Sequence, residues 1–319
     1  LILLIMNYYF LIVSLFCLYF TGCNKSSELS QTEQSSANES EIASKDVDIV
    51  WGEDGNSVLL KTNWIPGKEY NFRQVTDMKM DLPLAGAEGS KTEMSIDFKI
   101  DVQSLDNSSN KKIQLGFDKV KMTMQMAGQN MVYDSEDPDN QSPLLKTTLS
   151  SLGDQKYEAT FDENNKILSL EGEGEAAGNG LGMGAMSQGD VENMLQQLGD
   201  FKFPEAMIDP DTKWQNKQNF KMQQIGEMNM TVDYTYQGPV ESDGKKLAKI
   251  TFSGKAETSG EGLVSFKDSK MIGTMLFDPK LGALLESETK MDMTMSIGGE
   301  AGAEMDTATV SKYRLISVD

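Results

Sequence analysis

The sequence predicts a mainly β protein: an antiparallel, curved sheet or half-barrel built from two divergent β-rich halves, with two short amphipathic helices. Two observations lead to this prediction. Apolar and polar side chains alternate with a period of two through most of the chain after residue 49, which is typical of strands that bury one face. Short stretches rich in Gly, Asn, Asp and Pro separate these runs and indicate turns.

Residues 1–22 are predicted to be a lipoprotein signal peptide. They form an apolar, uncharged run that leads into Thr21-Gly22-Cys23, and small residues before a cysteine resemble the processing site of a bacterial lipoprotein leader. In such a leader the cysteine, here Cys23, is acylated and becomes the mature N-terminus. Phe20 stands where Leu is usual, and no Lys or Arg precedes the run. The alternative is an uncleaved signal anchor, since the run is long enough to span a bilayer; both interpretations attach the protein to a membrane.

Residues 23–48 are rich in Ser, Glu, Gln and Asn and predict a disordered tether.

The composition of the whole chain argues against several classes of function. The net charge of −20 makes the chain a poor partner for nucleic acid. Because the only cysteines are Cys17 and Cys23, we expect no disulfide in the folded part. The sequence has no histidine, which removes the commonest general base, so we expect no enzyme activity and no cofactor.

The N-terminal β-rich half is predicted to span residues 49–171. Its clearest strand runs from Met94 to Val102, where apolar and polar residues alternate without an error. In the next strand the apolar positions change from odd to even numbers, which predicts a β-bulge between Gly116 and Lys119. A third strand places these apolar residues on one face: Tyr70, Phe72, Met78, Met80 and Leu82.

Two helices and a glycine-rich stretch are expected to interrupt the strands. Ser142-Pro143 is a typical helix start, with Leu145, Leu149 and Leu152 on one stripe. A second helix is predicted from Asp190 to Gly199, where Val191, Met194, Leu195 and Leu198 follow helical spacing. Residues 172–189, before this second helix, are predicted to be either a flexible linker or a flap.

The C-terminal β-rich half is predicted to span residues 190–319, and it contains a weak internal repeat. Pro66-Gly67 and Pro210-Asp211 each open a strand-rich half, and Phe161-Asp162 and Phe277-Asp278 each precede a turn and a returning strand. We interpret this pattern as a divergent duplication of an antiparallel β unit. The alternative is that hairpins share turn residues for local reasons.

Several of these features together resemble a family of bacterial lipoproteins known only as a domain of unknown function, DUF6263. They are the tether, the Pro-Gly-Lys-Glu-Tyr opening at Pro66, the methionine-alternating strands, the element from Met131 to Ser135 and the Phe161-Asp162 hairpin. The resemblance covers roughly residues 50–319. It implies a surface or periplasmic β-rich lipoprotein and provides no catalytic residue. Residues 172–189 are longer and richer in glycine than the family leads us to expect.

The most distinctive chemical feature is the set of methionines, of which the chain has 21. Thioethers bind soft cations, but alternating methionines are also the inward face of a strand, and without histidine we favour that interpretation and predict no metal site. The candidate apolar-ligand face consists of Met78, Met80, Met94, Met122, Met124, Met126, Met291, Met293 and Met295. The acidic turn from Asp134 to Asp139 has oxygens suited to Ca²⁺ but lacks EF-hand spacing, so a solvated loop is favoured.

Two functional hypotheses follow from the sequence. The first is a non-catalytic, membrane-anchored lipoprotein whose methionine-lined β cavity binds an apolar or lipid-like ligand. The second is a structural or interaction lipoprotein with a solid β core that docks an envelope protein. In both, the expected location is the cell envelope, periplasmic or surface-exposed, with the outer membrane favoured over the inner.

Overall fold

The computed structural model describes most of the chain after residue 49. The residues described are 50–81, 89–104, 110–126, 128–150, 152–153, 155–163, 165–173, 191, 195, 201–222, 226–259, 264–297 and 303–319. The strands are β1 (Lys68–Asp81), β2 (Ser90–Ser104), β3 (Lys111–Met126), β4 (Gln129–Asp134), β5 (Lys156–Phe161), β6 (Ile167–Glu173), β7 (Lys213–Met222), β8 (Gly226–Ser242), β9 (Lys245–Ser259), β10 (Val264–Asp278), β11 (Ala283–Ile297) and β12 (Ala303–Val318).

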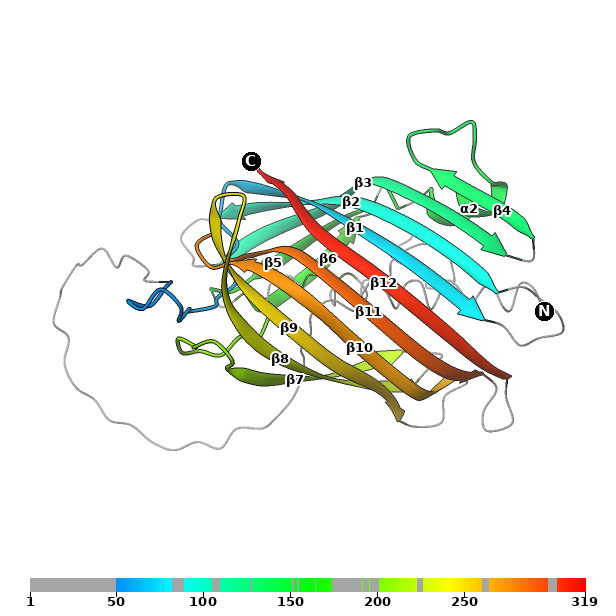
Figure 1. Ribbon diagram of the computed structural model, residues 1–319. Coiled ribbons are helices and arrows are strands. Elements are labelled where there is room, and N and C mark those ends of the chain that lie inside the picture. The colour runs from blue at the N-terminus through cyan, green and yellow to red at the C-terminus, as the bar shows by residue number, and fades with distance from the viewer. Residues whose placement is uncertain are drawn as a thin grey trace.

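All twelve strands belong to one open antiparallel sheet. Its order is β6-β5-β3-β2-β1-β12-β11-β10-β9-β8-β7, and β4 pairs with β3 beside this path. The first and last strands therefore pair with each other in the middle of the sheet, while β6 and β7, which follow each other in sequence, form its two edges (Figure 1). The two predicted halves thus contribute to a single continuous sheet.

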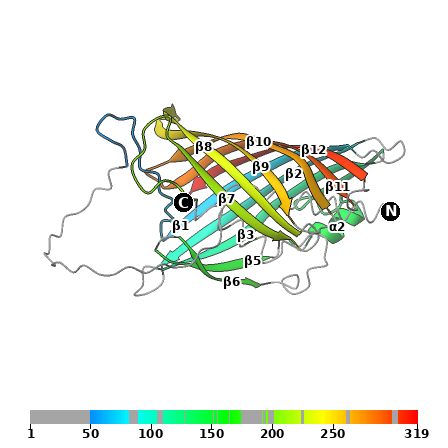
Figure 2. The same ribbon diagram turned by 90° about the horizontal axis from the view of Figure 1, so that it is seen from below.

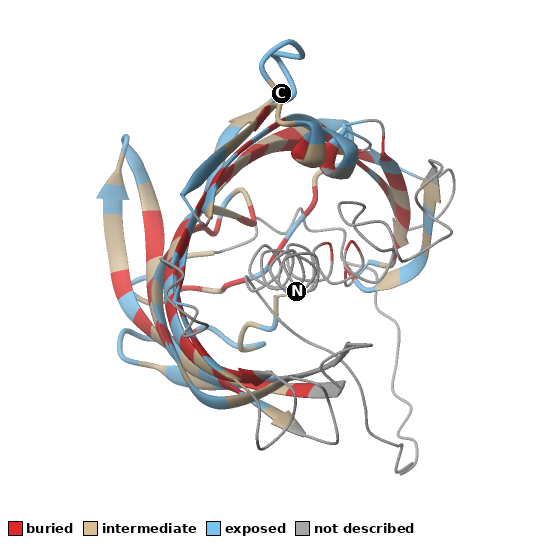
Figure 3. Cartoon of the chain, turned by 90° about the vertical axis from the view of Figure 1, so that its right-hand side faces the viewer, coloured by how far each residue is buried: buried red, intermediate tan, exposed pale blue. Residues whose placement is uncertain are grey.

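The sheet is curved and buries one face, as the alternating sequence predicts. Viewed along the strands, it forms an arc around an interior (Figure 3). In β2 every second residue from Ser90 to Val102 is buried, and in β12 the same alternation runs from Met305 to Tyr313. We call the buried surface the inner face. The predicted inward positions on β1 are confirmed, except that Leu82 lies outside the described residues.

The opposite, outer face carries ion pairs between neighbouring strands. Arg73 of β1 donates from Nε and Nη2 to the two carboxylate oxygens of Asp97 of β2, each over 2.7 Å. Lys112 of β3 pairs with Glu158 of β5, and Arg314 of β12 pairs with Glu286 of β11. Charged side chains on one face and apolar ones on the other make this a sheet with one solvated side.

The predicted bulge is present in β3. Asp97 of β2 pairs with Lys119, whereas the adjacent Phe98 pairs with Phe117, so Asp118 is the extra residue. On the other side of β3, residues before the bulge pair with β5 and residues after it pair with β4. The bulge therefore lies where β3 changes its second partner, and the added twist of a bulge suits that divergence.

One of the two predicted helices is described, α2 (Pro143–Leu149), with Leu145, Leu149 and Leu152 buried as expected. Ser142 precedes it, but its hydroxyl accepts a 2.9 Å hydrogen bond from the Val132 amide of β4 rather than capping the helix. Of the second helix only Val191 and Leu195 are described, and both are helical and buried. Nearly all of the predicted linker or flap lies outside the described residues. No helix in the described part of the chain has the length and hydrophobicity of a membrane span.

Residues 50–66, which we call the end segment, cross the end of the sheet away from α2 (Figures 1 and 2). Hydrogen bonds join this segment to both halves of the chain. Asn165, in the β5–β6 turn, donates to the Thr62 carbonyl over 2.8 Å, and the Asn63 amide donates to the Gly282 carbonyl in the β10–β11 turn, also over 2.8 Å. The segment also forms paired backbone hydrogen bonds between Val58 and Ile208.

In both turns that suggested an internal repeat, the aspartate side chain accepts hydrogen bonds from backbone amides of the turn. In the first, Asp162 Oδ1 accepts a hydrogen bond from the Lys166 amide; in the second, Asp278 Oδ1 accepts from the amides of Lys280 and Leu281. Both turns contact the end segment. The strand openings also agree, because Gly67 and Asp211 both have positive φ angles, of 79° and 68°. These likenesses are compatible with a duplication, which stays a prediction.

Candidate ligand-binding face

The predicted methionines from both halves of the chain meet on one surface. Methionines of β1, β2 and β3 adjoin those of β11 because β1 pairs with β12, and β12 with β11. Eight of the nine are buried, and Met126, at the end of β3, is half-buried. Met94 and Met122 lie directly opposite each other on β2 and β3, and Met295 lies opposite Met305 of β12. Sequence periodicity thus predicted the inward orientation of these methionines. That they bind a ligand stays a prediction.

Hydroxyl side chains alternate with these methionines across the strands. Thr309 of β12 lies between Met78 of β1 and Met291 of β11, and Thr92 of β2 lies between Met78 and Met124 of β3. We call this surface the methionine–hydroxyl face; its members are Thr76, Met78, Met80, Ser90, Thr92, Met94, Met122, Met124, Thr289, Met291, Met293, Thr307, Thr309 and Ser311.

Sequence reasoning missed these hydroxyl residues. On β12 the inward positions are Thr307, Thr309 and Ser311, and a search for alternating apolar residues passes over them because they are polar. The signal that could have found them is their period-two spacing, with Ala308 and Val310 between them and the charged Asp306 and Lys312 on either side. The predicted lipidation residue, Cys23, lies outside the described residues.

Towards the end segment the inner face becomes aromatic. Trp64 of the end segment packs edge-on against Tyr70, with ring centroids 4.9 Å apart, and Phe72 stacks against both Phe98 and Tyr313. Aromatic rings pack in a few preferred geometries, whereas the unbranched methionine side chain is flexible and adapts to irregular gaps. The inner face therefore has an aromatic end with rings in mutual contact and an adaptable methionine–hydroxyl part.

Three tyrosines at this end have raised pKa values. Burial raises the pKa of the Tyr313 hydroxyl well above its ordinary value, and no described residue provides it with a hydrogen bond. Burial also raises the pKa of Tyr70, whose Oη accepts a 3.1 Å hydrogen bond from the Ile65 amide. The pKa of Tyr236 is raised by burial and by the nearby charge of Asp54. These groups stay neutral at physiological pH.

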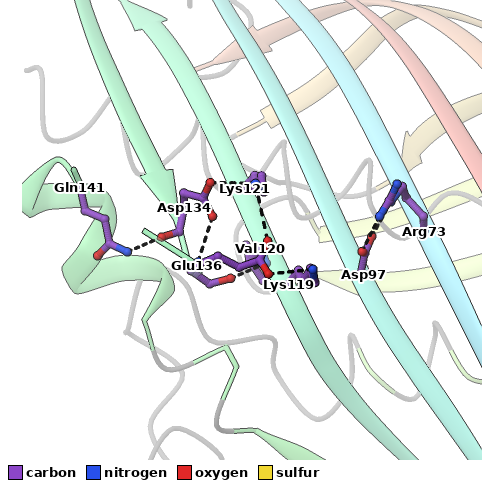
Figure 4. Close-up of polar contacts among 9 residues, drawn as sticks. Arg73, Asp97, Lys119, Val120, Lys121, Asp134, Glu136 and Gln141 are labelled. Atoms are coloured by element: carbon purple, nitrogen blue, oxygen red, sulfur yellow. Dashed lines mark hydrogen bonds and ion pairs between the residues drawn. The ribbon is translucent and has the colours of Figure 1, made fainter. Parts of the chain in front are cut away.

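Two carboxylates of the acidic turn after β4 form ion pairs with lysines of β3 (Figure 4). Lys121 Nζ lies 2.8 Å from Asp134 Oδ2, and Lys119 Nζ lies 2.7 Å from Glu136 Oε1. The hydrogen bond from Lys121, with a second from the Glu136 amide, lowers the pKa of Asp134. Within the described ranges no three acidic, cysteine or histidine side chains are grouped as a metal site would require. Surface ion pairs therefore account for Asp134 and Glu136 of the turn.

A separate groove of about 700 Å³ lies beside the C-terminal end of β12. Its apolar lining includes Leu247, Leu276, Leu285 and Ile316, and Ile316 is 52% exposed. Charged side chains such as Arg314 also line it. None of the predicted methionines contributes to this groove, so it is a second, independent candidate surface.

Comparison with known proteins confirms the predicted family resemblance over part of the chain. Residues 108–201, which include β3 to β6, match the "Family of unknown function (DUF6263)". No curated protein matches the chain.

The similar solved structures are distant. A lipovitellin structure titled for its lipid–protein interactions has 12% identity and a TM-score of 0.48 over 81% of this chain; this chain covers 26% of that one. A Bacteroides fragilis protein described as exported, with a YmcC-like fold, has 10% identity and a TM-score of 0.23, covering 82% and 99% of the two chains. An outer membrane channel of Pseudomonas putida F1 has 8% identity and a TM-score of 0.19, covering 80% and 98%. These distant neighbours thus include exported and outer-membrane proteins.

Proposed function

We propose that this protein is an exported, membrane-anchored and non-catalytic lipoprotein that binds an apolar, lipid-like ligand on its methionine–hydroxyl face. The observation that carries the proposal is the concentration of methionines from β1, β2 and β3 and from the distant β11 on one buried, uncharged surface. Among the described buried residues, Asp278 is the only carboxylate, lysine or arginine, and it lies at the β10–β11 turn.

The chemistry of the face suits a loosely specific apolar site. Methionine side chains are unbranched and polarisable, so they adapt to ligands of irregular shape. Each buried CH₂ group of a ligand contributes about 0.8 kcal/mol, so an acyl chain of a dozen such groups gains on the order of 10 kcal/mol before the entropic cost of association. The solvated outer face, with its cross-strand ion pairs, leaves the inner face as the apolar surface of the sheet.

Ligand content tests this proposal. The full-length protein is purified from its native membrane, and native mass spectrometry with solvent extraction identifies bound lipids. We expect co-purified lipid in the wild type and at least severalfold less in a Met78→Gln, Met291→Gln variant, because glutamine keeps the length of methionine but is polar. Lys99→Gln, on the outer face, is the matched control and should retain the lipid. Wild-type protein that carries no lipid and takes none up from vesicles would contradict the proposal.

Membrane attachment through Cys23 is tested separately. The apolar run before Thr21-Gly22-Cys23 motivates it. Cys23→Ser should leave the leader uncleaved or release the protein from the membrane fraction. Cys17→Ser is the control, because Cys17 lies within the leader and would be removed with it. Identical processing and fractionation of Cys23→Ser and wild type would exclude lipidation at this residue.

The groove beside β12 favours a second candidate function, docking of an envelope protein. Its exposed Ile316 is an apolar side chain within a concave surface. A photoreactive residue at position 316 should then cross-link to a partner in intact cells. Position 272 is the matched control, since Ile272 is similarly exposed, at 45%, but does not line the groove. Equal cross-linking at both positions would exclude a specific dock.

A further inference from the structure

Five hydroxyl groups of the methionine–hydroxyl face are buried without a hydrogen-bond partner in the described part of the chain. They belong to Ser90 and Thr92 of β2, Thr289 of β11, and Thr307 and Thr309 of β12. Each of these residues is at most 4% exposed. Buried hydroxyls in proteins are normally hydrogen-bonded, so a group of five on neighbouring strands requires an explanation.

The strand register explains why the protein itself does not satisfy them. Thr307 lies opposite Met80 and Met293, in the same arrangement that places Thr309 and Thr92 between methionines. The thioether is at best a weak acceptor. One pair of facing hydroxyls does bond, since Thr76 Oγ1 lies 3.2 Å from Ser311 Oγ, whereas Thr289, also opposite Ser311, stays without a partner in the described part of the chain. The unpartnered hydroxyls are thus mainly those that alternate with methionine.

A solid hydrophobic core would gain nothing from these hydroxyls. Valine has nearly the same shape as threonine, is a good strand former and leaves no polar atom unsatisfied. An unmade hydrogen bond in a buried position carries a free-energy cost that a bound acceptor removes. The pattern therefore indicates a ligand that is mainly apolar but has oxygen acceptors at intervals.

The methionine–hydroxyl face carries no charged side chain, which favours an uncharged ligand over an anionic one. All members of the face are methionine, serine or threonine, so no cation is present on it to neutralise a buried carboxylate or phosphate. Hydroxyls two residues apart on one strand, such as Thr307 and Thr309, are separated by roughly 6.5–7 Å. Neutral ester groups, which accept hydrogen bonds but carry no charge, match this set of donors.

We infer that the methionine–hydroxyl face binds an uncharged acyl ester lipid of the diacylglycerol type. Its acyl chains lie against the methionines, and its ester carbonyls accept hydrogen bonds from hydroxyls such as those of Thr92, Thr307 and Thr309. This inference rests on the proposed function and specifies its ligand class. It gives the hydroxyls a role in ligand selection, since they discriminate between an ester lipid and a hydrocarbon of equal length.

The test compares three probes with the full-length protein: a dipalmitoyl diacylglycerol, hexadecane and palmitate. We expect wild type to bind the diacylglycerol most tightly. A Thr92→Val, Thr309→Val variant should bind it about tenfold or more weakly, which is the loss expected for two hydrogen bonds of ordinary strength. Its affinity for hexadecane should be unchanged. The same variant should melt at a higher temperature than wild type without ligand, because two unsatisfied hydroxyls are removed.

Thr123→Val is the matched control, because Thr123 is exposed on the outer face of β3; it should change neither binding nor melting temperature. Equal affinity of wild type and the double variant for the diacylglycerol would overturn ester recognition while lipid binding stands. Tighter binding of palmitate than of the diacylglycerol would overturn the uncharged class. If wild type binds none of the three probes, the proposed function fails together with this inference.

Discussion

The indole ring of Trp64 stands edge-on to the phenol ring of Tyr70, with the two planes at 89°. Tyr70 also accepts a hydrogen bond from the amide of Ile65, the residue after Trp64. One residue of the central strand β1 thus holds the end segment by a ring contact and a hydrogen bond. Because the end segment also bonds to the β5–β6 and β10–β11 turns, it connects the middle of the sheet to both halves.

Removing a tyrosine hydroxyl should have opposite consequences at two positions on the inner face. Tyr70→Phe loses the bond to the Ile65 amide and should lower the free energy of unfolding by about 1 kcal/mol. Tyr313→Phe removes a buried hydroxyl without a partner among the described residues and should leave stability equal or higher. Urea unfolding at pH 7 measures both. A larger loss in Tyr313→Phe than in Tyr70→Phe would contradict the assigned hydrogen bonds.

The raised pKa of Tyr313 predicts a loss of stability at alkaline pH. In the folded state the Tyr313 hydroxyl stays protonated, whereas in the unfolded state the same hydroxyl ionises near pH 10. The contribution of this difference to the free energy of unfolding is therefore complete below pH 10 and is lost as the pH rises above that value. Tyr313→Phe should therefore shift the alkaline unfolding midpoint upward. Circular dichroism and tyrosinate absorbance, recorded together, check this. Tyr70→Phe serves as the comparison, and ionisation of Tyr313 before unfolding would refute the prediction.

Alanine substitutions at two turn glycines should distinguish the cost of backbone strain from the cost of a steric clash with the end segment. Gly244 and Gly282 have nearly equal positive φ angles, of 72° and 69°. A Cβ at Gly244 would meet nothing within 4 Å, whereas one at Gly282 would lie 2.6 Å from Asn63 Cβ. Gly244→Ala should cost about 1–2 kcal/mol, the ordinary penalty of a left-handed residue. Gly282→Ala should cost about 1–3 kcal/mol more, through overpacking. Equal unfolding free energies of the two variants would show that the end segment does not pack against this turn.

The two faces of β2 should respond differently to substitution. Phe98 is 3% exposed and packs against Phe72, so Phe98→Asp places an unpaired charge in the core and should unfold the protein. Lys99, the next residue, forms an exposed ion pair with Asp118 over 3.8 Å. Lys99→Gln should change the unfolding free energy by no more than about 0.5 kcal/mol. Circular dichroism and urea titration measure both, and comparable damage by the two substitutions would contradict the strand orientation.

Local patterns account for the features that the sequence could predict. Alternation fixes which residues of β2 point inward, because a strand turns successive side chains to opposite faces. The change of phase around Asp118 likewise indicates the bulge, and Ser142-Pro143 marks the start of α2. Each of these signals comes from residues close together in the chain.

The order of the strands could not be predicted in the same way. Asn71 and Ser317, joined by a side-chain hydrogen bond, are 246 positions apart, and no local pattern encodes that pairing. The hydroxyl part of the candidate site was missed for a related reason. The period-two spacing of Thr307 and Thr309 indicates that they point inward, but their position between the methionines of β1 and β11 follows only from the strand order.

The central pairing of β1 with β12 also has a consequence for how the chain folds. Contacts between residues so distant in sequence make folding slow, because a very long loop must close before they form. During synthesis or translocation, β1 can pair with β2 early, but its other edge has no native partner until the last strand has emerged. Through that interval β1 presents a full-length open edge to any other strand, so mispairing and aggregation are favoured until β12 pairs with it. Truncation within β12 would prolong the same exposure indefinitely.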